Sequence, residues 1–125
     1  MKNKTVFIAE DNPIIAMNIK QILKNAGVKI ILLFNDPNSL YNNSLSNPPD
    51  LIITEITFKN NKDTLEYYNT LCNEYHIPLI FITSHNFEDY RKQLHCPHCY
   101  FLSKPFDVDS LMGRLKNLFG DAVFK

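Results

Sequence analysis

The chemically active side chains of this 125-residue sequence follow short apolar runs. They are carboxylates, hydroxyls and one ammonium, namely Glu10, Asp11, Glu55, Thr83, Ser84 and Lys104. Crowded carboxylates resist ionisation, and a divalent cation or an ammonium relieves their repulsion. Mg²⁺ suits such ligands, because it binds a few carboxylates and keeps several waters. Together these groups could transfer a phosphoryl group to a carboxylate, a reaction that depends mostly on positioning and charge neutralisation.

The elements that must position these residues can be predicted from the apolar pattern. Strands are expected at 5–9, 29–34, 51–54, 79–82 and 100–102, and helices at 13–26, 37–47, 63–75, 87–94 and 108–119. Strands that alternate with helices predict a doubly wound, flavodoxin-like α/β fold. Its five-stranded parallel sheet would have the order 2-1-3-4-5, with five helices. Sites in such sheets lie beyond the carboxyl ends of the strands, so the active side chains should meet there.

Composition narrows the function further. Lys plus Arg is 13 and Asp plus Glu is 13, and this balance argues against direct nucleic-acid binding by this domain. No apolar run approaches the ~20 residues that span a bilayer. The apolar run 5–9 is too short for a signal peptide, which predicts a cytoplasmic protein with reduced cysteines. The length suits one domain over 1–125, with a core at about 5–119.

Four motifs resemble those of the receiver domain of two-component response regulators. They are the acidic pair and turn at 10–13, the third-strand segment 49–55, the hydroxyl-bearing strand 81–84, and the Lys-Pro segment 101–106. The resemblance implies a phosphoacceptor position at Glu55 and a metal-binding pocket of Glu10, Asp11 and the Thr57 carbonyl. It also implies that Thr83 and Lys104 contact phosphate and that Phe101 is the switch aromatic.

The phosphoacceptor position departs from the family pattern, because Glu55 stands where the family has Asp. The sequence therefore predicts an atypical receiver that is set through Glu55 or works without phosphorylation, and not a metabolic enzyme. The alternative is a conventional receiver with weak, Mg²⁺-dependent phosphotransfer. The longer arm of Glu55 should favour an ion pair with Lys104, leaving Mg²⁺ weakly bound or absent. A cis peptide bond before Pro105 is expected to aim Lys104 into the pocket.

A second candidate site is the segment Cys96-Pro97-His98-Cys99. The same residue types form redox sites, but there a helix N-terminus stabilises the thiolate, whereas here a strand follows. Cys96, His98 and Cys99, with His95, also resemble part of a zinc knuckle, which usually draws on a second pair of ligands. Cys72 is expected in the core. A plain loop is the preferred interpretation, and a small metal or redox sensor is the second alternative.

The expected partners are proteins. By resemblance, the fourth helix, fifth strand and fifth helix form the surface for a sensor kinase, an output domain or another signalling protein. A dimer is a further assembly to consider. The sequence predicts no membrane partner, and it names neither the kinase nor the output.

Overall fold

Five strands and five helices alternate along the part of the chain that the computed structural model describes, residues 4–56, 62–83, 88–96 and 99–120. The strands are β1 (Thr5–Ala9), β2 (Ile30–Phe34), β3 (Leu51–Glu55), β4 (Leu79–Thr83) and β5 (Cys99–Ser103). The helices are α1 (Pro13–Asn25), α2 (Pro37–Ser46), α3 (Lys62–Asn73), α4 (Glu88–Arg91) and α5 (Val108–Phe119).

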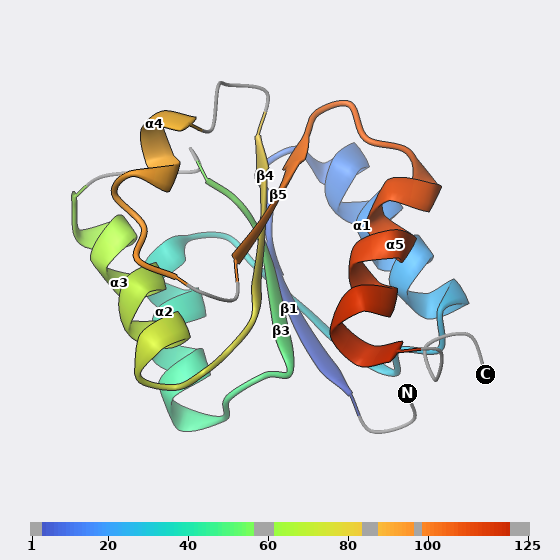
Figure 1. The fold of residues 1–125 in the computed structure, drawn as a ribbon. Helices are drawn as coiled ribbons and strands as arrows, with labels where there is room; N and C mark the ends of the chain where they lie inside the picture. Colours follow the sequence, from blue (N-terminus) through green and yellow to red (C-terminus); the bar gives the residue numbers. More distant parts are fainter. Residues whose placement is uncertain (1–3, 57–61, 84–87, 97–98, 121–125) are drawn as a thin grey trace.

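The strands form one parallel sheet in the order β2-β1-β3-β4-β5, as the sequence predicts. Helices α1 and α5 cover one face, and α2, α3 and α4 cover the other (Figure 1). The fold is therefore doubly wound and flavodoxin-like. β3 lies at the centre of the sheet. All five of its residues are buried, including its last residue, Glu55.

The core has two layers because side chains on a strand point alternately to opposite faces of the sheet. The layer under α1 and α5, here called the first cluster, includes Val6, Ile8, Leu51, Ile53, Ile80, Ile82, Leu102, Leu111 and Leu115. The layer under α2, α3 and α4, the second cluster, includes Phe7, Ala9, Ile52, Tyr68, Leu71, Cys72, Leu79, Phe81 and Leu94. Both faces of β1, β3 and β4 are therefore apolar.

Helix caps fix the loops beside the candidate site. The Asn12 side chain accepts hydrogen bonds from the backbone of Ile14 and Ile15, and Pro13 occupies the first turn of α1. These contacts satisfy amide groups that a helix start leaves unpaired. Helix α1 therefore begins directly after the acidic pair. At its other end Gly27 adopts a φ of 94°, a conformation that glycine tolerates best.

Helix α4 ends earlier than predicted, at Arg91 and not near residue 94. The side chain of Asn69 in α3 explains where it ends. Asn69 donates to the carbonyl of Gln93 at 3.2 Å and accepts from the amide of His95 at 2.8 Å. These bonds draw the chain away from a helical path. Within the described ranges, no helix has the length and apolar character needed to cross a membrane.

Candidate functional site

Three charged residues extend the strand pattern beyond the first cluster. They stand two positions after Ile8, Ile53 and Leu102, and are Glu10, Glu55 and Lys104, respectively. Because strand side chains repeat every two residues, all three are directed to the same face of the sheet, at its carboxyl edge. The predicted gathering of carboxylates and ammonium thus follows from the alternation itself.

Lys104 joins the two glutamates. Its Nζ lies 2.6 Å from Glu10 Oε1 and 2.6 Å from Glu55 Oε2. The side chains of Glu10 and Glu55 are 0% and 6% exposed, and that of Lys104 is 16% exposed. The expected pairing of Glu55 with Lys104 is therefore present, and Glu10 shares the same ammonium.

The Glu10 carboxylate is held from two sides. Its Oε2 accepts a hydrogen bond from the Asn12 amide at 3.0 Å. Its Oε1 is buried and receives no well-aligned hydrogen bond from a described residue, so its short contact with Lys104 is an ion pair. Burial raises the pKa of Glu10, and the opposing effects of Asn12 and Lys104 do not cancel it. Glu10 is therefore a buried anion short of positive charge.

Burial and the neighbouring charges also oppose each other at Lys104, but here the charges have the larger effect on the pKa. Burial lowers the pKa of this ammonium, but its close contacts and charge interactions with the Glu10 and Glu55 carboxylates outweigh burial and raise it. Lys104 therefore stays protonated at neutral pH. One positive charge faces two buried carboxylates, while Asp11, the other half of the acidic pair, is exposed.

Backbone contacts aim Lys104 into this pocket. Its amide donates to the Thr83 carbonyl at 2.8 Å, which continues the pairing of β5 with β4. The Lys104–Pro105 peptide bond is cis, as the sequence predicts. Thr83 itself is fully buried at the end of β4.

Phe101 lies on the other face of the sheet. Its ring packs on the second cluster, with its centre 5.4 Å from that of Phe81. The Arg91 guanidinium carbon lies 4.9 Å from the Phe101 ring centre, which is a cation–π arrangement. Thr57, Ser84 and His98 lie outside the described residues.

The chain matches the family model of the response regulator receiver domain over residues 6–116. It belongs to this family. The transcriptional regulatory protein CrdR of Helicobacter pylori is 26% identical over 121 residues. The match covers 94% of this chain but only 56% of CrdR, so the chain spans little more than half of that regulator's length.

Solved receiver structures share the fold. A response regulator receiver protein from Sinorhizobium medicae matches with a TM-score of 0.81 at 19% identity, covering 95% of this chain and 96% of that one. The Francisella response regulator 1452 receiver domain gives 0.75 at 23% identity, covering 93% and 96%. These structures show the fold, and the family match identifies the chain as a receiver domain of two-component signalling, with Glu55 at the end of its third strand.

Mg²⁺ is the cofactor associated with receiver domains, and the pocket can be tested for it. Carboxylate oxygens are the right donors, and Glu10 Oε1 is a buried acceptor without an aligned hydrogen bond. However, the Lys104 ammonium lies at hydrogen-bonding distance from both buried carboxylates, where a cation would have to bind. As arranged, the residues do not fit Mg²⁺, since the ion would have to displace Lys104.

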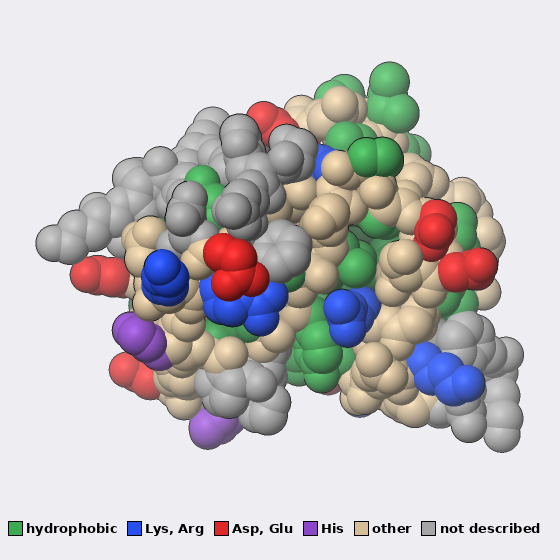
Figure 2. Space-filling view, turned by 45° about the horizontal axis from the view of Figure 1, so that its top comes forward, with side chains coloured by type: hydrophobic (Ala, Val, Ile, Leu, Met, Phe, Trp, Pro, Cys, Tyr) green, Lys and Arg blue, Asp and Glu red, His purple; other side chains and the backbone are tan. Residues whose placement is uncertain are grey.

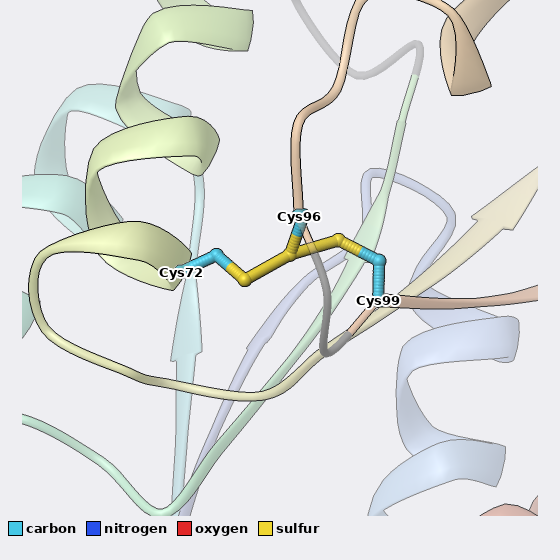
Figure 3. Close-up of side chains that lie close together, drawn as sticks. All are labelled: Cys72, Cys96 and Cys99. Atoms are coloured by element: carbon cyan, nitrogen blue, oxygen red, sulfur yellow. A yellow bond between two sulfur atoms is a disulfide. The ribbon is translucent and has the colours of Figure 1, made fainter.

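The cysteines of the receiver domain lie at the opposite edge of the sheet. Cys72 is in the last turn of α3, Cys96 precedes β5 and Cys99 begins it, and their sulfurs converge (Figure 3). Cys72 is fully buried, as predicted, but its contact with Cys96 was not expected. The winding of the fold could have revealed it. Helix α3 leads into β4, so it ends beside the start of β5, the next strand of the sheet.

Proposed function

We propose that this receiver domain is set by its own Glu55–Lys104 ion pair and signals without phosphorylation of Glu55. The observation that carries the proposal is the position of Lys104 Nζ, 2.6 Å from carboxylate oxygens of both Glu55 and Glu10. The resemblance assigns Lys104 to the phosphoryl group. In this chain a carboxylate already takes that contact.

The length of Glu55 supports this reading. One extra carbon–carbon bond carries the carboxylate ~1.5 Å further than an Asp would reach. In-line attack on a phosphodonor tolerates little displacement, since ~1 Å can cost ~100-fold in rate. Glu55 also carries one negative charge, whereas a phosphoryl group adds ~1.5–2. The ion pair should therefore resemble the phosphorylated state only in part.

We further propose that Mg²⁺ binds this pocket weakly or not at all. Glu10 and Asp11 remain as candidate ligands, but the Lys104 ammonium neutralises part of the charge that would attract the ion. Mg²⁺ also demands near-ideal octahedral geometry, which a displaced Glu55 carboxylate disfavours. The pocket then works as an internal ion pair and not as a phosphotransfer centre.

The output is proposed to be a protein contact through α4, β5 and α5. β5 is an edge strand, and two arginines from the flanking helices cover its aromatic residues. Arg91 lies over Phe101 at 4.9 Å and Arg114 over Tyr100 at 5.4 Å. Tyr and Arg are among the residue types enriched at the energetic centres of protein interfaces, and these side chains are at least partly exposed. Charged side chains of both signs are mixed over the visible face in Figure 2, which agrees with a protein partner better than with nucleic acid.

The kind of protein that binds this surface is proposed from the relatives. A sensor kinase, an output domain or a second receiver would fit this surface. CrdR is a transcriptional regulatory protein and is longer than this chain, so a covalently linked output domain is one form that the partner could take. We propose that this domain is a signalling and interaction module that does not itself bind DNA. Its cytoplasmic location stays a prediction.

The decisive experiment compares the native chain with Glu55→Asp and Glu55→Gln. Each protein is incubated with a small-molecule phosphodonor and Mg²⁺, and intact-mass and peptide mass spectrometry locate any added phosphoryl group. NMR shifts of β5 amides report whether labelling reaches the proposed partner surface. We expect no label on the native chain or on Glu55→Gln. We expect label on Glu55→Asp, together with shifts around Phe101.

The outcomes separate the alternatives. A phosphoryl group on Glu55 of the native chain would overturn the proposal in favour of a conventional receiver. Labelled Glu55→Asp with altered β5 shifts would identify a switch that Glu55 holds in one state. If Glu55→Asp gains neither label nor altered shifts, Glu55 does not govern the domain and the proposal fails.

A further inference from the structure

Three sulfur atoms, one from α3 and two from the chain at the start of β5, meet at the amino edge of the sheet (Figure 3). The sulfurs of Cys72, Cys96 and Cys99 all lie within 4.8 Å of one another. The Cα atom of Cys96 is 5.7 Å from that of Cys72 and 5.5 Å from that of Cys99. Cys96 is thus the central member of a three-sulfur cluster. This cluster is separate from the carboxylate pocket, which occupies the other edge.

Disulfide bonds cannot join all three sulfur atoms of the cluster at once. The Cys96 sulfur contacts the sulfurs of both Cys72 and Cys99, as for a disulfide. A cysteine sulfur has only one bond left beyond its Cβ, so Cys96 can form one of these disulfides at a time. A single disulfide would leave the third cysteine as a thiol. A metal ion, by contrast, can bind three thiolates at once.

Hydrogen bonds from Asn69 place Cys96 beside α3. Asn69, three residues before Cys72 on the same helix, holds the carbonyl of Gln93 and the amide of His95. The chain therefore reaches Cys96 along the side of α3. β5 pairing then fixes Cys99 opposite Leu79. The three ligand positions are thus set by contacts that do not involve sulfur, which reduces the ordering cost of binding an ion.

The surroundings suit a soft metal ion. Cys72 is fully buried, whereas Cys96 and Cys99 are half-buried, so an ion can enter from the surface and bind at the edge of the apolar second cluster. Thiolates select ions such as Zn²⁺ and Cu(I) over the hard Mg²⁺. Among the described residues the group comprises these three cysteines alone, and His95 is not part of it.

We propose that Cys72, Cys96 and Cys99 form a three-thiolate site for one thiophilic metal ion, with Zn²⁺ or Cu(I) as the occupant. Binding replaces the thiol protons, so up to three protons pass to the buffer and no oxidant is consumed. Cu(I) is satisfied by three thiolates, whereas Zn²⁺ takes solvent or another ligand in a fourth position. The bound ion joins the end of α3 to the start of β5, the strand that carries Phe101 and leads to Lys104.

The test titrates the full chain, reduced and freed of metal, with Zn²⁺ and separately with Cu(I), each against a chromophoric chelator. Co²⁺ serves as a spectroscopic probe, because thiolate coordination produces charge-transfer absorption that carboxylates do not. We expect one ion per chain and release of protons. Cys96→Ser and Cys99→Ser should weaken binding by more than the roughly 10–100-fold that follows loss of a group merely supporting a ligand.

Two control variants test whether binding depends on the cysteines alone. His95→Ala tests a neighbouring side chain outside the cluster, and Asp11→Asn tests the carboxylate edge. Both should leave the affinity unchanged. If a serine variant fails to fold, protection of all three thiols from alkylation by the ion in the native chain gives the same answer.

Tight binding of either ion that depends on the cysteines supports the site, and comparison of the two titrations identifies the occupant. If the native chain binds neither ion more tightly than Cys96→Ser does, the proposed site is overturned. A disulfide that persists after reduction and anaerobic exchange would also overturn it, because it would remove two of the three ligands. None of these results depends on phosphorylation of Glu55.

Discussion

The hydroxyls of Thr54 and Tyr68 lie 2.9 Å apart in the buried core next to Glu55. Thr54 is 0% exposed and Tyr68 is 1% exposed. Burial raises the pKa of Tyr68 to about 12, with a smaller opposing effect from Thr54 and a further rise from the Glu55 charge. The two hydroxyls thus connect the strand that ends in Glu55 to helix α3.

Tyr68→Phe should lower the free energy of unfolding by about 1–2 kcal/mol, because it removes a partner of the buried Thr54 hydroxyl. It should also change the alkaline behaviour. The unfolded chain loses the Tyr68 proton near pH 10 and the folded chain near pH 12, so native stability falls as the pH rises above 10. Urea unfolding at several alkaline pH values would reveal this. In Tyr68→Phe that part of the loss should be absent, and Tyr75→Phe, at an exposed position, should keep it.

Lys104→Met should destabilise the fold strongly at neutral pH. It leaves the buried Glu10 and Glu55 carboxylates without their ammonium. Breaking a buried pair costs up to ~3–5 kcal/mol, and we expect about 3 because Lys104 is partly exposed. Denaturant unfolding measures the loss. Lys29→Met, at an exposed position, is the control and should change stability by less than about 0.5 kcal/mol.

The pH dependence of that loss distinguishes an ion pair from simple packing. The raised pKa of Lys104 means that its contribution is complete below pH 10.5 and disappears as the pH rises through its folded pKa. Below neutrality, Glu10 protonates at a pKa raised above 4.5, and the cost of leaving it unpaired fades. The difference between native and Lys104→Met should therefore be largest between these limits. A difference that is constant with pH would contradict the ion-pair account.

Much of the site could be predicted because the period of a strand is two. The residues two positions beyond Ile8, Ile53 and Leu102 had to reach the same edge, and they are Glu10, Glu55 and Lys104. The pattern could not predict how far the Lys104 ammonium neutralises the carboxylates around it. Glu10 and Asp11 are adjacent acids, yet only Glu10 is buried, and it lies on the face of the sheet that Glu55 and Lys104 share.

The cysteine cluster and α4 show why other parts escaped prediction. Local periodicity places Cys72 on the apolar side of α3, which is correct, but contains no information on Cys96. Likewise, the length of α4 depends on Asn69, a side chain of a different helix. Both features arise from long-range contacts, whereas the strands and the other helices follow from patterns within each segment.

Ile53→Ala should test the apolar base of the pocket. Ile53 is fully buried in the first cluster, two residues before Glu55. The lost burial and the resulting cavity should lower the free energy of unfolding by about 2–5 kcal/mol. Ile14→Ala is a matched control, because Ile14 is 79% exposed, and it should change stability by no more than about 0.5 kcal/mol. Equal effects of the two substitutions would show that β3 is not the centre of the core.

Removal of the Lys104 charge should make the pocket a better Mg²⁺ site. In the native chain the ion competes with an ammonium 2.6 Å from both Glu10 and Glu55, so binding should be weak. In Lys104→Met the same carboxylates and the exposed Asp11 face the ion unneutralised. The affinity should rise at least about tenfold, which corresponds to ~1.4 kcal/mol. NMR titration of folded protein measures it, with Lys29→Met as a control for net charge and Lys104→Met/Glu10→Gln as a test of the ligand. Submillimolar Mg²⁺ affinity in the native chain, centred on Glu10 and Asp11, would show that the ammonium does not block the pocket.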